Sequence, residues 1–297
     1  MATVRTRSEV GITRYSVQVE LTEADFKYLT PKLRLEPSML SESQVFSKTF
    51  HTVCSASRCM SIVQEVLQRR QQLGKTLAER PIFIWEPVPN LCTPEEQEAF
   101  FAANHMVDVV SPNELELGMM FGQPGWSEDS EHGRQLVRRI LESGIGPEGK
   151  GHLVIRAGKD GSYGYSQTQR IWLPAYHEPT PGATAVVDPT GAGNSFLGAL
   201  AQGMVSEGRD PVNIIDGILA TSDDWRKAME SWGAQKHVLI ALIFATVAAG
   251  FVVEQIGVPQ ISVSGDGKEL WNGIGFTDRV RVYAERLCKL SDQVFRP

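Results

Sequence analysis

The sequence predicts an α/β fold in which a doubly wound, mostly parallel sheet carries helices on both of its faces. Short apolar runs alternate along the chain with amphipathic stretches of helical period, and this alternation is typical of parallel strands joined by helices. The chain has 297 residues, of which 42% are hydrophobic and 22% charged, so it is long enough to bury a large core.

Helices and strands alternate in the first half of the chain. Residues 55–74 place apolar side chains at helical spacing and end at a glycine, which indicates an amphipathic helix. Thr93, followed by Pro94 and acidic residues, predicts a helix over residues 93–105 with the threonine as its N-cap. Two buried strands and a further helix are expected at residues 81–87, 107–113 and 133–144.

A hairpin is expected next. Residues 152–158 and 162–166 have the composition of strands, and the Asp160-Gly161 pair between them favours a tight primed turn. The aromatic-rich residues 170–179 predict a packed strand and its exit loop rather than a binding surface.

The last third of the chain predicts one more strand and two helices. Residues 186–188 are the expected strand, and the helix after it should end near Gly208. A polar stretch at 221–237 resembles a surface insertion. Residues 238–253 are apolar throughout, but 16 residues fall short of the roughly 20 that cross a bilayer, and Glu254 follows at once. We therefore expect a buried, alanine-rich helix and no membrane association.

Charge and composition exclude several classes of partner. The formal net charge of −6, without a dense Lys/Arg run, disfavours nucleic acid and leaves a small-molecule substrate as the expected ligand. The start of the chain has charges without an apolar core behind them, so we expect no export and a cytoplasmic protein. No C-x-x-C spacing occurs among the four cysteines, which indicates free thiols at Cys54, Cys59, Cys92 and Cys288.

A glycine-rich turn lies between the predicted strand at 186–188 and the helix after it. Gly191, Ala192 and Gly193 present little or no side chain, so their N–H groups can converge on an anion. The positive end of the helix dipole adds to this attraction. We expect an anion hole for a phosphate or a carboxylate at this corner.

The string DPTGAGN, Asp188–Asn194, resembles the D-T-x-G-A-G-D signature of the ribokinase-like (PfkB) carbohydrate and nucleoside kinases. Residues 111–118, SPNELELG, resemble the N-x-x-E motif of this family, and residues 153–165 its hairpin. The resemblance covers roughly residues 50–260 and is closest to the fungal maintenance-of-killer-like branch. It implies a ribokinase-like fold, with ATP and Mg²⁺ as cofactors.

The resemblance also implies roles for individual residues. Asn113 and Glu116 would act on the phosphates and the magnesium–water network, Glu116 toward the metal through a water. Gly158 and Thr246 would lie near the nucleotide. Asp188 would stabilise the loop or help to bind cations.

Three features depart from the family pattern. Asn194 stands where the family has its catalytic aspartate, and an amide cannot take a proton from an acceptor hydroxyl, so general-base help worth about 10²–10⁴ in rate is in question. Asn194 could instead cap the following helix. Pro189 replaces a threonine and removes one N–H beside the hole. Acceptor-site residues and the β lid are not recognisable near the start.

We therefore interpret residues 1–50 as a diverged remnant of the lid and N-terminal region, with the lid reduced or absent, and residues 51–297 as the ribokinase-like domain. Three functions stay open. One is a kinase-like protein that binds ATP or another anion and transfers phosphate weakly to a sugar or nucleoside hydroxyl. The second is an inactive pseudokinase scaffold. The third is a biosynthetic isomerase, cyclase or lyase that uses the cleft without ATP. Homo-oligomerisation also stays open.

Overall fold

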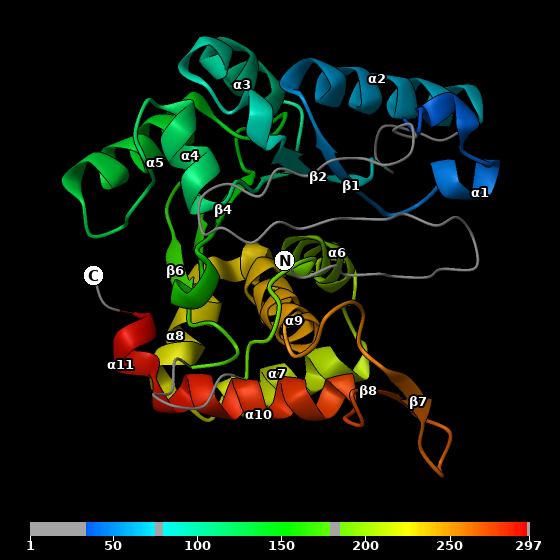
Figure 1. The fold of residues 1–297 in the computed structure, drawn as a ribbon, viewed down its shortest axis with the longest axis vertical. Helices are drawn as coiled ribbons and strands as arrows, with labels where there is room; N and C mark the ends of the chain where they lie inside the picture. Colours follow the sequence, from blue (N-terminus) through cyan, green and yellow to red (C-terminus); the bar gives the residue numbers. More distant parts are fainter. Residues whose placement is uncertain (1–33, 75–79, 179–184, 296–297) are drawn as a thin grey trace.

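The computed structural model describes residues 34–74, 80–178 and 185–295. A six-stranded sheet runs through its centre in the order β1-β2-β3-β4-β5-β6 (Figure 1). The first four strands are parallel, and the last two pair antiparallel, so the sheet is mixed and mostly parallel as expected. The strands are β1 (Thr49–Cys54), β2 (Ile82–Pro87), β3 (Val109–Val110), β4 (His152–Arg156), β5 (Ser162–Tyr165) and β6 (Arg170–Leu173).

Helices cover both faces of this sheet, which confirms the predicted α/β architecture (Figure 1). One face carries α2 (Ala56–Gln72), α3 (Gln97–Asn104), α4 (Glu114–Met120) and α5 (Glu131–Ser143). The other carries α6 (Ala192–Gly203), α7 (Asp210–Leu219), α8 (Asp223–Trp232), α9 (Lys236–Val252), α10 (Phe276–Lys289) and α11 (Ser291–Val294). A short helix α1 (Glu42–Val45) precedes β1, and β7 (Ile261–Val263) pairs with β8 (Glu269–Trp271) in a separate hairpin.

Alternation along the strands divides the core into two clusters. Phe83 and Trp85 of β2 pack with α2 to α5, whereas Ile84 between them packs with α6 and α9. Successive strand side chains point to opposite faces, so a strand covered on both faces is mainly apolar, and this explains the apolar run from Ile82 to Trp85 in β2.

The apolar stretch at 238–253 forms the central helix of the second cluster. It lies within α9, whose residues are nearly all buried, and α9 packs closely on α6. Within the described residues, no single helix combines the length and the hydropathy to cross a bilayer; α8 and α9 would do so only together, and they are bent by 119° at their junction.

Several local predictions were wrong or incomplete. Residues 186–188 form no strand, because the Val187 and Asp188 N–H groups donate to the Val253 carbonyl at the end of α9 instead of joining the sheet. Thr93 makes no side-chain cap; a 3₁₀ turn at Pro94–Glu96 leads into α3. The turn between β4 and β5 is a 3₁₀ turn, Gly158–Asp160, rather than a primed two-residue turn.

The polar segment at 221–237 is more than a surface loop. It contains α8, an amphipathic helix whose Trp225 and Trp232 are buried in the second cluster. At the other end of the chain, β1 crosses the expected domain boundary at residue 50. That division, and the reduced lid, stay predictions, since residues 1–33 lie outside the described part of the chain.

Candidate functional site

The glycine-rich corner lies at the start of α6. Gly191 is the N-cap of this helix and has φ +87°, a left-handed conformation that glycine adopts without the strain a Cβ would bring. The loop before it is held by the two hydrogen bonds to Val253 and by the Asp188 side chain, whose Oδ1 accepts from the Thr190 N–H at 2.9 Å. Asp188 thus stabilises the loop, one of the two roles expected for it.

Two backbone N–H groups at this corner have no partner. The Ala192 N–H donates to the Pro189 carbonyl at 3.1 Å, and the Ser195 N–H donates to the Gly191 carbonyl at 3.0 Å. Within the part of the chain that the structure describes, the N–H groups of Gly193 and Asn194 make no hydrogen bond. Free N–H groups in the first turn of a 12-residue helix attract an anion.

Asn194 is not the N-cap of α6, so the capping interpretation was wrong. The helix begins at Ala192, three residues earlier than that interpretation requires, because Gly191 provides the cap. Asn194 lies in the first helical turn, and its side chain is exposed. The Asn194 amide does not take up a proton near neutral pH, so Asn194 does not supply the general base that the family's aspartate supplies.

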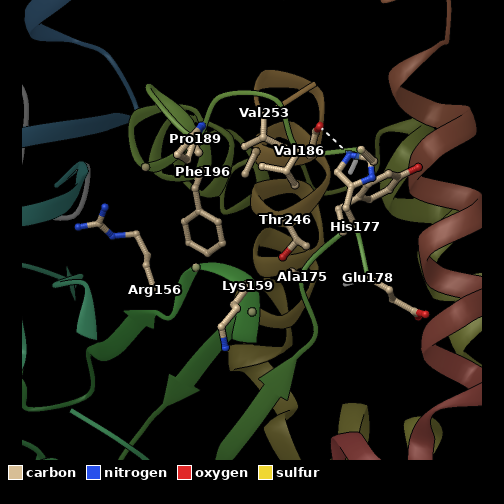
Figure 2. A pocket seen from close by; sticks show the side chains of 18 of the residues that line it. Arg156, Lys159, Ala175, His177, Glu178, Val186, Pro189, Phe196, Thr246 and Val253 are labelled. Atoms are coloured by element: carbon tan, nitrogen blue, oxygen red, sulfur yellow. Dashed lines mark hydrogen bonds between the residues drawn. The ribbon is translucent and has the colours of Figure 1, made fainter. Parts of the chain in front are cut away.

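A cavity of about 810 Å³ opens beside the start of α6. In Figure 2, Arg156 and Phe196 lie on one side of this cavity, His177 and Glu178 on the opposite side, and Thr246 of α9 between them. Most of its walls are apolar. Five of the residues singled out in the sequence line it, namely Asn113, Gly158, Ala192, Gly193 and Thr246, whereas Glu116, Asp188, Gly191 and Asn194 do not.

Gly158 and Thr246 each have a structural role apart from any contact with a ligand. Gly158 has φ +51° and begins the 3₁₀ turn after β4. The Thr246 hydroxyl donates to the Leu242 carbonyl one turn earlier in α9, at 2.9 Å, so its proton is already used. Both contribute shape to the cavity, and their proposed contact with nucleotide stays a prediction.

Asn113 and Glu116 form a capping box at the start of α4. The Asn113 side chain accepts from the Glu116 N–H at 2.8 Å, and the Glu116 Oε2 accepts from the Asn113 N–H at 2.7 Å. Glu116 is only 4% exposed, and burial raises the pKa of its carboxyl above the usual value despite the opposing effect of Arg156. The N-x-x-E spacing therefore has a local structural cause.

A buried ion-pair network that sequence reasoning missed lies behind this capping box. Arg156 Nη2 is 2.8 Å from Glu86 Oε1 and 3.2 Å from Glu116 Oε2, and it also donates to the Ser111 carbonyl at 3.0 Å. His51 Nε2 lies 3.4 Å from the second Glu86 oxygen. Burial alone would raise the pKa of Glu86, but His51 and Arg156 outweigh it, so that pKa lies below its usual value.

The sequence did contain a signal for this network. Glu86 is the residue before the last of β2, and Arg156 is the last of β4. Each follows a run of apolar residues, and a charged residue at the carboxyl end of a buried parallel strand faces the edge where ligands bind. His51, on β1, gave no comparable signal.

The fit of Mg²⁺ to Glu116 can be judged from these contacts. Magnesium is bound by open carboxylate oxygens and waters in octahedral geometry. The Glu116 carboxylate is buried, its Oε2 already accepts from a backbone N–H and pairs with Arg156, and it does not line the cavity. As folded, Glu116 does not fit a magnesium ligand. Among the described residues, moreover, no three His, Cys, Asp or Glu side chains gather closely enough to hold a metal ion.

The opposite wall of the cavity has a polar edge. His177 Nε2 lies 3.0 Å from the Gly250 carbonyl oxygen (Figure 2). It also lies 3.2 Å from Glu254 Oε1, and Arg279 pairs with the same carboxylate at 2.6 Å. The aromatic-rich segment after β6 therefore contributes to the cavity wall, although we expected only a packed strand and its exit loop.

Comparison with known proteins agrees with this architecture. Residues 53–262 match the pfkB family of carbohydrate kinases. Protein MAK32 of Saccharomyces cerevisiae is 30% identical over 272 residues, which cover 87% of this chain and 64% of that protein. The uncharacterized protein C16C9.01c of Schizosaccharomyces pombe is 29% identical over 275 residues, or 89% of this chain and 67% of that protein. The chain thus spans about two thirds of the length of these fungal relatives.

Among solved structures, the ribokinase of Giardia lamblia superposes with a TM-score of 0.51 at 18% identity, over 86% of this chain and 64% of that one. At that identity the likeness shows the fold alone. The expected ribokinase-like fold and the resemblance to the fungal branch are confirmed. With the family match covering most of the chain, this protein belongs to the pfkB family of carbohydrate kinases.

Proposed function

We propose that this protein binds ATP in the cavity beside α6, with its phosphates at the Gly-Ala-Gly corner, and that it transfers phosphate to a sugar or nucleoside hydroxyl only weakly. Kinases of carbohydrates need a phosphoryl donor, and the family membership makes ATP the first candidate. The acceptor is not specified by any residue described above.

One observation carries this proposal: Gly193, whose N–H is free at the start of a helix, and Arg156, whose side chain is only 12% exposed, lie at the same end of one cavity. The Gly193 and Asn194 N–H groups supply partial positive charge, and Arg156 supplies a full one. Elsewhere the cavity is lined mainly by apolar side chains such as Phe196, Val186 and Val253, which suit the flat face of a base.

Weak transfer follows from the residue at position 194. An asparagine can orient a hydroxyl but cannot remove its proton, and that step is typically worth about 10²–10⁴ in rate. Phosphoryl transfer depends mainly on positioning and charge neutralisation, so residual activity is compatible with this loss. A protein with binding but without measurable transfer would correspond to the pseudokinase alternative.

Gly193→Asp tests the binding site. The new carboxylate would repel phosphate, and its Cβ would lie 2.5 Å from Arg156 Nη1, so ATP should no longer raise the melting temperature of the variant. The matched control is Gly198→Asp, on the same helix, where a Cβ meets nothing within 4 Å. Stabilisation by ATP that persists in Gly193→Asp would remove the corner from the proposed function.

A further inference from the structure

Arg156 ends β4 and reaches the start of α6. A Cβ placed on Gly193 would lie 2.5 Å from Arg156 Nη1, so the guanidinium lies directly against the helix start. Arg156 also lines the cavity, at the edge shown in Figure 2. The Arg156 guanidinium and the free N–H group of Gly193 are therefore parts of one surface, and the free N–H of Asn194 follows in the same helical turn.

The described residues hold one terminal nitrogen of this guanidinium, Nη2, and leave the other, Nη1, free. Nη2 makes all the contacts described above, with Glu86, Glu116 and the Ser111 carbonyl. Nη1 has no hydrogen-bond partner in the described part of the chain, and Nε is buried without one. Arginine presents its donors in a rigid fork, so fixing one nitrogen also fixes the direction of the others. The free nitrogen is thus preorganised for an anion at the cavity end.

Because of these contacts, the carboxylates of Glu86 and Glu116 are not available as metal ligands. Glu116 and Glu86 both pair with Arg156, and both are nearly inaccessible, with side chains only 5% and 11% exposed. Releasing either one to a cation would remove one of the two carboxylates that pair with Arg156, whose side chain is only 12% exposed, and breaking a buried ion pair is costly.

We propose that Arg156 takes the place of a protein-bound divalent cation at this site, so that nucleotide phosphates bind directly to its free nitrogen and to the α6 N–H groups without Mg²⁺. This inference rests on the proposed function, because it specifies how the same site holds its ligand. It goes beyond that function by predicting metal-independent binding and by naming the residue responsible.

The experiment is isothermal titration of the full chain with ATP, once in EDTA and once in excess Mg²⁺. We expect dissociation constants that agree within about threefold in the two buffers. Arg156→Lys keeps the positive charge between the two glutamates but loses the fork, and ATP affinity should fall about tenfold in both buffers. Arg134→Lys, at an exposed position on α5, is the matched control and should bind like the wild type.

The outcomes separate the two proposals. Binding that requires Mg²⁺ would overturn the metal-independent inference and leave the proposed function intact. Equal binding in both buffers that Arg156→Lys does not weaken would overturn the role of the arginine. Absence of ATP binding in both buffers would overturn the proposed function and this inference with it. Should Arg156→Lys fail to fold, the comparison of buffers on the wild type still decides metal independence.

Discussion

At the scale of single residues, glycine and asparagine at the start of α6 determine what the corner can do. Gly191 allows the chain to turn sharply into the helix, and Gly193 leaves room for the Arg156 guanidinium. A side chain at position 191 would be strained by the left-handed backbone, and one at position 193 would meet the Arg156 guanidinium. Asn194, by contrast, is exposed, so its side chain can be replaced without disturbing the core.

Asn194→Asp should restore general-base chemistry at the corner. A carboxylate in the first turn of α6 is compatible with the helix dipole, so the variant should fold, and its ATP hydrolysis should rise about tenfold or more over the wild type. The measurement is phosphate release from ATP at saturating nucleotide. Asn213→Asp, at an exposed position of α7, controls for added charge. An unchanged rate in a variant that still binds ATP would argue against the kinase interpretation.

His152 provides a pH-dependent contribution to stability at the base of β4. Burial, with a smaller contribution from His237, lowers its pKa from 6.5 to about 4, so the folded state keeps the imidazole neutral while the unfolded chain protonates it near pH 6.5. His152 therefore does not lower the free energy of unfolding above about pH 6.5. As the pH falls from 6.5 toward 4, the unfolded chain takes up a proton that the folded state does not, and the free energy of unfolding declines. The total loss from this group is about 3 kcal/mol.

His152→Phe should abolish this pH-dependent contribution to the free energy of unfolding. The phenylalanine ring can still stack on Trp232, whose centroid lies 6.0 Å from that of His152. Urea unfolding at a series of pH values from 7.5 to 4 measures it, and the wild type should lose more stability than the variant across this range. His132→Gln, at an exposed position, is the control. Parallel pH profiles for wild type and His152→Phe would show that this histidine is not held neutral.

At the scale of elements, the packing of α6 against α9 sets the geometry of the site. Gly203 of α6 lies so close to α9 that a Cβ there would be 2.6 Å from the Ala241 Cα. Because the obstacle is backbone, it cannot rotate away. The end of α9 in turn holds the glycine-rich loop through the Val253 carbonyl. The distance between these two helices therefore positions both the corner and one wall of the cavity.

Gly203→Val should separate the two helices and destabilise the fold by about 1–3 kcal/mol. Thermal unfolding followed by circular dichroism measures this change. Gly198→Ala, on the same helix but facing open space, should instead be neutral or stabilising by up to about 1 kcal/mol. Equal effects of the two substitutions would contradict the close approach of α6 and α9.

Sequence reasoning at this scale succeeded where periodicity was strong. The helix at 56–72, the strand at 82–87 and the apolar helix at 236–252 lie almost where they were expected. It failed at 186–188, where β-branched residues indicated a strand. The Val187 and Asp188 N–H groups donate to the Val253 carbonyl, a partner 66 and 65 residues away that no local pattern can reveal.

At the scale of the whole molecule, the site lies at the carboxyl ends of the parallel strands, where both helical layers contribute to it. The capping box of α4 comes from one layer, the glycine-rich corner of α6 from the other, and β4 brings Arg156 between them (Figure 1). The sequence predicted the two motifs because each is local. Their connection through Glu86 and Arg156 depends on strand order, so it became visible only in the fold.

The most direct test of the account is a crystal structure of the protein with bound ATP. The account predicts phosphate oxygens about 3 Å from the Gly193 N–H nitrogen and from Arg156 Nη1, with the base in the apolar part of the cavity. Nucleotide bound elsewhere, or a protein side chain occupying the start of α6 in its place, would contradict it.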